Sequence, residues 1–162
     1  MTVTVTQVRG STTAMTITLA SLAFSATAGR ESTAVDNSST LAVDYDLGGF
    51  ITTGTSPTSG NLIEVWCYGS YDGTSYIGGA AGTDGALTPV GAKSLMRLIA
   101  AIPVTSSSNI KYTWQCGSVA NLFGGLMPVK FGIWVLNNTA VNLHATGGNH
   151  EAKYTAIKYQ SA

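Results

Sequence analysis

The feature that most constrains this chain is a two-residue alternation of apolar and polar side chains. In residues 41–47 (LAVDYDL), four apolar residues fall on one side of an extended chain and both aspartates on the other. Successive side chains of a β-strand point to opposite faces, so this period indicates a strand with one buried face. No segment of ten or more residues shows a clean helical period, and only residues 118–123 (SVANLF) favour a short helical turn.

About nine or ten short segments share this strand character and are rich in Val, Ile, Thr, Tyr and Trp. Turns with Gly, Asn or Asp–Gly separate most of them, as at 72–74, 83–85 and 147–149. This pattern predicts an all-β fold, an antiparallel two-sheet β-sandwich of jelly-roll type. It leaves the order of the strands open. The expected strands are 3–6, 15–19, 41–47, 61–68, 95–102, 110–116, 129–137, 140–144 and 154–159.

The chain divides into residues 1–13 and a single sandwich domain, residues 14–162. Residues 2–8 (TVTVTQV) alternate like a strand, and residues 10–13 (GSTT) have the composition of a flexible joint. A lone strand must pair with a sheet edge to satisfy its backbone groups. We favour the edge of a neighbouring chain, with Val3, Val5 and Val8 as partner contacts. The alternative is an ordinary first strand of the same sandwich.

A long Gly-rich excursion covers residues 71–91 and is nearly uncharged. It is longer than a hairpin connection needs. We expect it to fold over the sandwich or against a neighbouring subunit, with Tyr71 and Tyr76 as its anchors.

Charged residues make up only 10% of the chain, and eight Lys and Arg balance eight Asp and Glu. A typical soluble domain has about 25% charged residues, so this surface is neutral and polar. The composition argues against partners such as nucleic acid or an anionic membrane, which need clustered basic residues. A net charge near zero instead favours self-association.

The sequence offers no candidate for catalysis, for a cofactor site or for a metal site, so we expect a protein that is not an enzyme. Asp44 and Asp46 share a strand face opposite the apolar one, and two further aspartates belong to turn dipeptides. His144 and His150 lack metal-ligand spacing. Cys67 and Cys116 lie in strand-like stretches, where we favour two buried thiols over a disulfide.

Three stretches resemble small virion structural proteins of tailed bacteriophages. These are residues 21–41, which contain GRESTAVDN, residues 64–74 (EVWCYGSYDGT) and residues 118–138, which contain FGGLMP. The resemblance extends over most of residues 20–159 and does not include the first ten. It implies a capsid decoration (cement) protein or another head or tail protein without catalytic residues. The implied partners are the major capsid protein or another virion protein, and further copies of itself as a dimer or trimer.

The same resemblance implies a location on the capsid surface of the virion after synthesis in the bacterial host cytoplasm. A second function stays open, a carbohydrate- or receptor-binding module of a tail or cell-surface protein. In that case Tyr71, Tyr76 and Trp66 would offer aromatic faces for stacking.

Overall fold

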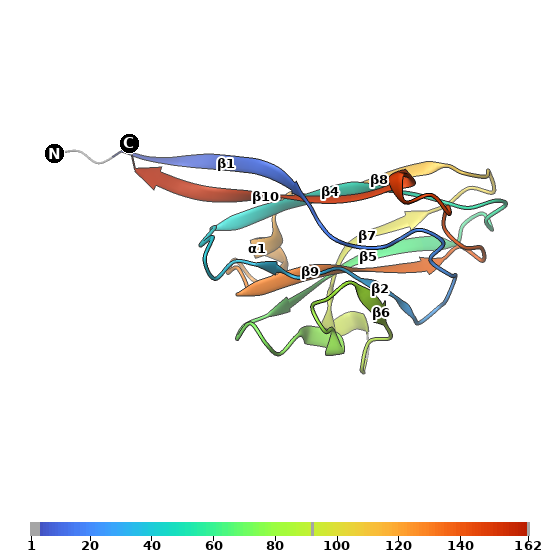
Figure 1. Ribbon diagram of the computed structural model, residues 1–162, viewed down its shortest axis with the longest axis horizontal. Helices are drawn as coiled ribbons and strands as arrows, with labels where there is room; N and C mark the ends of the chain where they lie inside the picture. The colour runs from blue at the N-terminus through green and yellow to red at the C-terminus, as the bar shows by residue number, and fades with distance from the viewer. Residues whose placement is uncertain (1–3, 92, 162) are drawn as a thin grey trace.

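The computed structural model describes residues 4–91 and 93–161, and its strands form two antiparallel sheets that pack together (Figure 1). The first sheet has the order β1-β10-β4-β8, and the second has the order β6-β2-β9-β5-β7, with β3 also pairing with β9. The strands are β1 (Val5–Ala14), β2 (Gly29–Glu31), β3 (Val35–Asp36), β4 (Asp44–Thr52), β5 (Leu62–Ser70), β6 (Gly85–Leu87), β7 (Arg97–Pro103), β8 (Lys111–Cys116), β9 (Lys130–Asn138) and β10 (His150–Ser161). The helical turns are η1 (Ile77–Gly79), η2 (Lys93–Leu95), α1 (Val119–Leu122) and η3 (Gly147–Asn149).

The strand order is that of a jelly roll. The main strands alternate between the sheets along the chain, from β1 to β2 to β4 to β5, and again from β7 to β8 to β9 to β10. The eight strands β1, β10, β4, β8 and β2, β9, β5, β7 thus make two four-stranded layers, and the short β6 extends the second layer. The prediction of an all-β, jelly-roll sandwich is confirmed.

The main core lies between the two sheets. Leu47 and Ile51 of β4 face Ile133 and Val135 of β9, and all four are almost completely buried. The alternation in residues 41–47 places Tyr45 and Leu47 in this core, but Leu41 and Val43 are 75% and 39% exposed because both precede the strand. The two-residue period therefore identified the buried face of β4.

Strand β9 is buried on both faces because the excursion 71–91 covers the outer face of the second sheet. Trp134 and Leu136 point away from the main core and pack with Leu87 and Met96 in a second cluster. Pairing of β6 with β2 fastens the excursion to the sheet edge. The prediction that this segment folds over the sandwich is confirmed.

The N-terminal segment differs from the favoured expectation. β1 pairs with β10 of its own chain, which is the alternative of an ordinary first strand. Residues 10–13 do not form a joint: they belong to β1, and the pairing shifts there by a bulge between Arg9 and Thr12. Val5 lies opposite Ser161 and Val8 opposite Lys158, an odd separation that puts the two valines on opposite faces. Val3 lies outside the described residues.

Two expected strands are also absent as regular elements. Residues 15–19 form no strand, yet Met15 and Leu19 are buried in the main core. Residues 140–144 make only an isolated bridge between Leu143 and Thr53. Both segments have apolar residues at alternate positions because an extended chain packs one of its faces on the sandwich. An extended chain can do this without forming a ladder of backbone hydrogen bonds, so the alternation alone did not identify a strand.

Cys67 and Cys116 are both free thiols. Cys67 is fully buried in the main core and Cys116 is half-buried against it. Burial raises the pKa of both thiols. In the described part of the chain, no helix is long and apolar enough to cross a membrane.

Candidate binding groove

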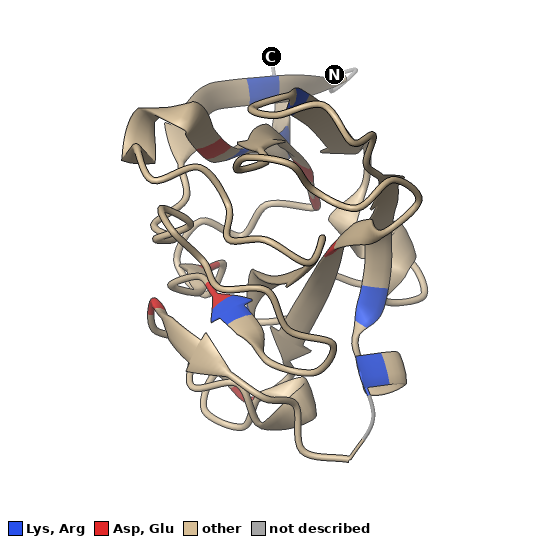
Figure 2. Ribbon diagram, turned by 90° about the vertical axis from the view of Figure 1, so that its right-hand side faces the viewer, with Lys and Arg blue, Asp and Glu red and all other residues tan. Residues whose placement is uncertain are grey.

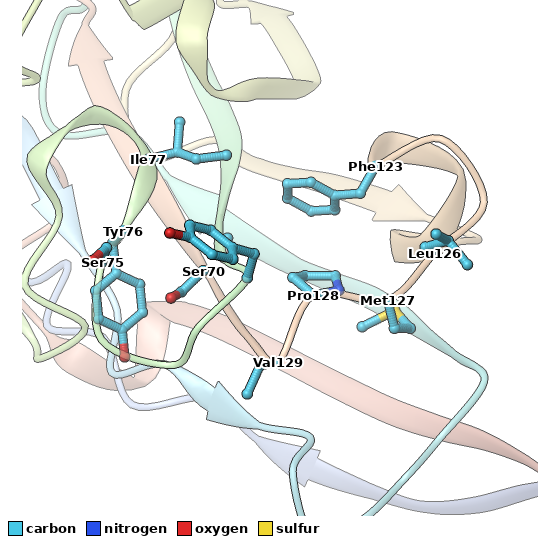
Figure 3. Close-up of a pocket in the computed structure, with 11 residues that line it drawn as sticks. Ser70, Ser75, Tyr76, Ile77, Phe123, Leu126, Met127, Pro128 and Val129 are labelled. Carbon is cyan, nitrogen blue, oxygen red and sulfur yellow. The ribbon is translucent and has the colours of Figure 1, made fainter.

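A surface groove of about 560 Å³ opens at the end of the sandwich where β5 finishes and β9 begins. One wall is the loop that follows β5, and the other is the segment between α1 and β9 (Figure 3). Its lining is mostly apolar. The residues are Gly69, Ser70, Tyr71, Ser75, Tyr76, Ile77, Phe123, Leu126, Met127, Pro128 and Val129.

The two predicted partner contacts in the excursion, Tyr71 and Tyr76, both line this groove but behave differently. Tyr76 is half-buried and packs edge-on against Tyr68, with ring centroids 5.7 Å apart. Tyr71 is 84% exposed at the groove's rim. Tyr76 therefore anchors the excursion on its own sandwich, whereas the exposed Tyr71 does not, and contact of Tyr71 with a neighbouring subunit stays a prediction.

The loop after β5 owes its shape to Asp72. The Asp72 carboxylate accepts hydrogen bonds from the backbone N–H groups of Thr74 and Ser75 at 2.8 and 2.7 Å, and from the Ser70 hydroxyl at 2.9 Å. These bonds, led by the one from Ser75, hold the pKa of Asp72 well below its usual range. Gly73 follows with a φ of 79°, a left-handed conformation that glycine adopts without strain.

The opposite wall of the groove, residues 123–129, packs closely against β5. A Cβ atom at Gly69 would come within 2.9 Å of the Phe123 ring and 3.3 Å of the Pro128 ring. Gly124 and Gly125, with φ of 75° and 93°, turn the chain after α1 so that Pro128 returns to the strand. Glycine at 69 thus lets the FGGLMP segment lie directly on β5.

The GRESTAVDN stretch meets the same region through backbone and side-chain bonds. Val35 pairs with Phe131 at the start of β9, and the Tyr68 hydroxyl donates to the Ser32 carbonyl at 2.6 Å. The Ser32 hydroxyl accepts from the N–H of Ile133 at 3.0 Å. The three stretches that carry the resemblance are therefore neighbours around the first residues of β9.

The sequence analysis missed Leu126 and Met127. Leu126 is 78% exposed and Met127 is half-buried, and both line the groove. The available signal was two large apolar residues directly after Gly124–Gly125, where a turn would normally be polar.

Trp66 does not contribute to the groove. It lies half-buried on the outer face of the second sheet, where its Nε1 donates to the Glu64 carboxylate at 2.8 Å and Lys93 Nζ lies 5.5 Å from the ring centre. The expected set of Tyr71, Tyr76 and Trp66 is therefore not a single stacking surface.

Several acidic side chains hold the fold together. The buried Glu31 carboxylate accepts from the N–H groups of Ala81 and Gly82 at 2.9 and 3.1 Å, which secures the excursion. Asp84 binds Arg30 and Thr18, each at 2.6 Å. Burial by itself would raise the pKa of Asp84, but these hydrogen bonds outweigh it and lower the pKa to about 2.

The histidines and the remaining charges form no metal cluster. His150 Nε2 contacts the His144 carbonyl at 2.9 Å, and burial lowers the pKa of His150. Within residues 4–91 and 93–161, no three His, Cys, Asp or Glu side chains are grouped to hold a metal ion. Figure 2 shows the charged residues scattered over both sheets.

No protein-family model, curated protein or solved structure matches this chain significantly.

Proposed function

We propose that this protein is a non-enzymatic structural subunit of a bacteriophage virion, a capsid decoration subunit that contacts the major capsid protein. The observation that carries the proposal is the groove itself. Its two walls come from YGSYDG and FGGLMP, which belong to two of the stretches that resemble small virion proteins and lie about fifty residues apart in the chain.

The chemistry of the groove suits a protein partner. Exposed Leu126 and half-buried Met127 and Phe123 offer apolar area without a charged side chain in the lining. An apolar side chain of a partner would bury this area and exclude water, as interface hot spots do. A contact of this kind gains strength when capsid symmetry repeats it many times.

A neutral surface also suits such a subunit. The chain has no net charge, so copies at neighbouring positions on a capsid do not repel one another over long distances. We propose that it is made in the host cytoplasm and binds the capsid surface from there.

One observation favours the second candidate, a carbohydrate- or receptor-binding module. The Tyr71 ring is 84% exposed at the rim, and a sugar ring stacks on such a face. Carbohydrate recognition also needs several free polar groups, and the Ser70 hydroxyl and the Asp72 carboxylate bind each other. We therefore favour the protein partner.

The test uses capsids of the phage that encodes the chain, prepared without this protein. We expect the purified protein to sediment with these capsids and to raise their resistance to heat or osmotic shock. Leu126→Asp should weaken binding at least about tenfold, because a carboxylate cannot enter an apolar contact. Val90→Asp is the matched control, since Val90 is 72% exposed outside the groove.

Binding without any gain in capsid stability would contradict cementing. Loss of binding in Val90→Asp but not in Leu126→Asp would contradict a role for the groove. A glycan array read with the wild type and with Tyr71→Ala tests the second candidate, and Tyr71-dependent glycan binding without capsid binding would replace the first proposal by the second.

A further inference from the structure

The first sheet ends in a two-stranded ribbon that projects beyond the sandwich (Figure 1). β10 pairs with β4 only as far as Ile157, which lies opposite Asp44 at the start of β4. Residues 158–161 of β10 continue and pair only with residues 5–8 of β1. An isolated two-stranded hairpin is marginally stable in water, so this ribbon gains from further pairing.

The free edge of the ribbon on the β1 side offers backbone groups that have no partner within the described sheet. Met15 donates its N–H to Ala152, and Val43 donates to Ile157. Even-numbered residues of β10 therefore bond toward β1, and odd-numbered ones bond toward β4.

This alternation fixes the direction of the β1 amides. Thr6 and Val8 lie opposite the even-numbered Gln160 and Lys158, so their backbone groups bond to β10. The N–H and C=O groups of Val5, Gln7 and Arg9 consequently point to the open edge. The edge is ten residues long and almost fully exposed, with one bulge after Arg9.

The other three sheet edges carry features that discourage pairing with another chain. β6 is only three residues long. β7 has Arg97 and Pro103 at its ends, and its pairing with β5 contains a bulge. β8 has six residues and begins with Lys111, whose Nζ lies over the Phe50 ring. β1 is thus the least protected edge of the sandwich.

We propose that the β1 edge pairs antiparallel with the β1 edge of a second copy of this chain. A two-fold axis brings identical edges together, so one surface serves both partners and the assembly closes as a dimer. The two first sheets then form one continuous eight-stranded sheet. The inference does not depend on the proposed virion function.

A second copy fits this edge better than a charged partner. Residues 5–8 carry no charged side chain. The neighbouring Arg9 does, but its guanidinium already pairs with the Asp46 carboxylate of the same chain. The uncharged remainder, rich in Val and Thr, has the composition of a good strand. The ribbon projects from the body, which leaves the β1 edge open to a second copy (Figure 1).

The outward groups also set the register. A two-fold axis at Gln7 places Gln7 opposite its own copy and Val5 opposite Arg9 of the second copy, so every outward group of residues 5–9 finds a partner. Other axes near this position place some of these groups opposite residues outside 5–9.

The first experiment measures mass in solution and amide exchange of the full chain. We expect a particle of twice the 16.7 kDa chain mass. Gln7→Pro should give a monomer whose unfolding midpoint matches that of the wild type diluted to monomer, because it removes one N–H that faces the open edge and none that faces β10. Gln7→Ala, which keeps that N–H, should remain a dimer.

Amide exchange by NMR then reports the edge directly. In the dimer the amides of Gln7 and Arg9 should exchange at least about tenfold more slowly than in the same protein diluted to monomer. The amides of Thr6 and Val8, which bond to β10, should be protected in both states. A monomer at all accessible concentrations, or equal exchange at Arg9 in both states, would overturn the proposal.

A cysteine pair tests the register. Gln7→Cys should form an intermolecular disulfide on mild oxidation, since the axis places the two thiols at neighbouring positions. Tyr159→Cys is the control: Tyr159 lies opposite Gln7 on the same face but two β1 strands separate it from its copy. Cross-linking of Tyr159→Cys with none of Gln7→Cys, or a Gln7→Pro protein that remains a dimer, would show a different interface.

Discussion

The α-carbon of Gly69 lies against the Phe123 ring, so close that a Cβ atom there would approach the ring carbons to 2.9 Å. Gly69 belongs to β5 and Phe123 follows α1, so this contact joins the two walls of the groove. The shape of the groove therefore depends on the absence of one methyl group.

Gly69→Ala should destabilise the protein by about 1–3 kcal/mol, because the ring and the neighbouring Pro128 must shift to admit the methyl group. Urea unfolding measures the loss. Gly117→Ala is the matched control and should cost little, since nothing lies within 4 Å of its Cβ position. Equal effects of both substitutions would contradict the packing described for Gly69.

Glu31→Gln should loosen the cover over the second sheet. Glu31 is 3% exposed and its carboxylate accepts from the N–H groups of Ala81 and Gly82. The neutral amide gives weaker bonds than the carboxylate, and its NH2 would replace the Oε1 that also accepts from Ala81 at 3.1 Å, so the loss should be about 1–3 kcal/mol. Hydrogen exchange should rise in residues 77–90. Glu151→Gln, which affects a partly exposed pair with Lys153, should leave that exchange unchanged.

Asp84→Asn should reduce stability at pH 7 by about 2 kcal/mol, since one pKa unit corresponds to about 1.4 kcal/mol. The folded-state pKa of Asp84 is lowered from its ordinary 3.8 to about 2 by Arg30 and Thr18. The carboxylate therefore contributes fully above pH 3.8, and its contribution is lost as the pH falls through about 2. Unfolding curves at pH 7 and pH 2 should show the gap between wild type and variant closing. A gap that stays constant would contradict this assignment.

Trp134→Phe should destabilise the protein by about 1 kcal/mol more than Trp114→Phe. Both indoles are buried, but Trp134 Nε1 donates to the Leu87 carbonyl at 3.1 Å, whereas Trp114 Nε1 has no partner among the described residues. Loss of Trp134 leaves a buried carbonyl without its donor, and loss of Trp114 removes a donor that was already unsatisfied. Thermal unfolding of the two variants makes the comparison.

The residues of β4 show how much of the fold is legible in the sequence. Tyr45 and Leu47 alternate with Asp44 and Asp46 in the sequence. In the structure Tyr45 and Leu47 are each 1% exposed. The two-residue period reflects the geometry of a single strand, which is local. The same reasoning identified the fold class and the short helical turn at α1, because each depends on neighbours in the chain.

The partner of β1 shows where this reasoning ends. Residues 2–8 alternate in the same way whether they pair with a neighbouring chain or with β10, which lies about 150 residues further along. GSTT resembles a joint by composition, yet pairing of Thr12 and Thr13 with Thr155 and Tyr154 makes it part of a strand with a bulge. Pairing energy comes from a distant segment and leaves no local mark.

The sequence by itself determined that this chain forms a sandwich of short strands, that its surface is nearly neutral and that residues 71–91 form a long Gly-rich excursion. Only the tertiary structure decided that Tyr76 is half-buried while Tyr71 is exposed, and that both line one groove together with Leu126. Periodicity depends on neighbours along the chain, whereas a groove depends on how two loops more than forty residues apart in sequence pack around one glycine.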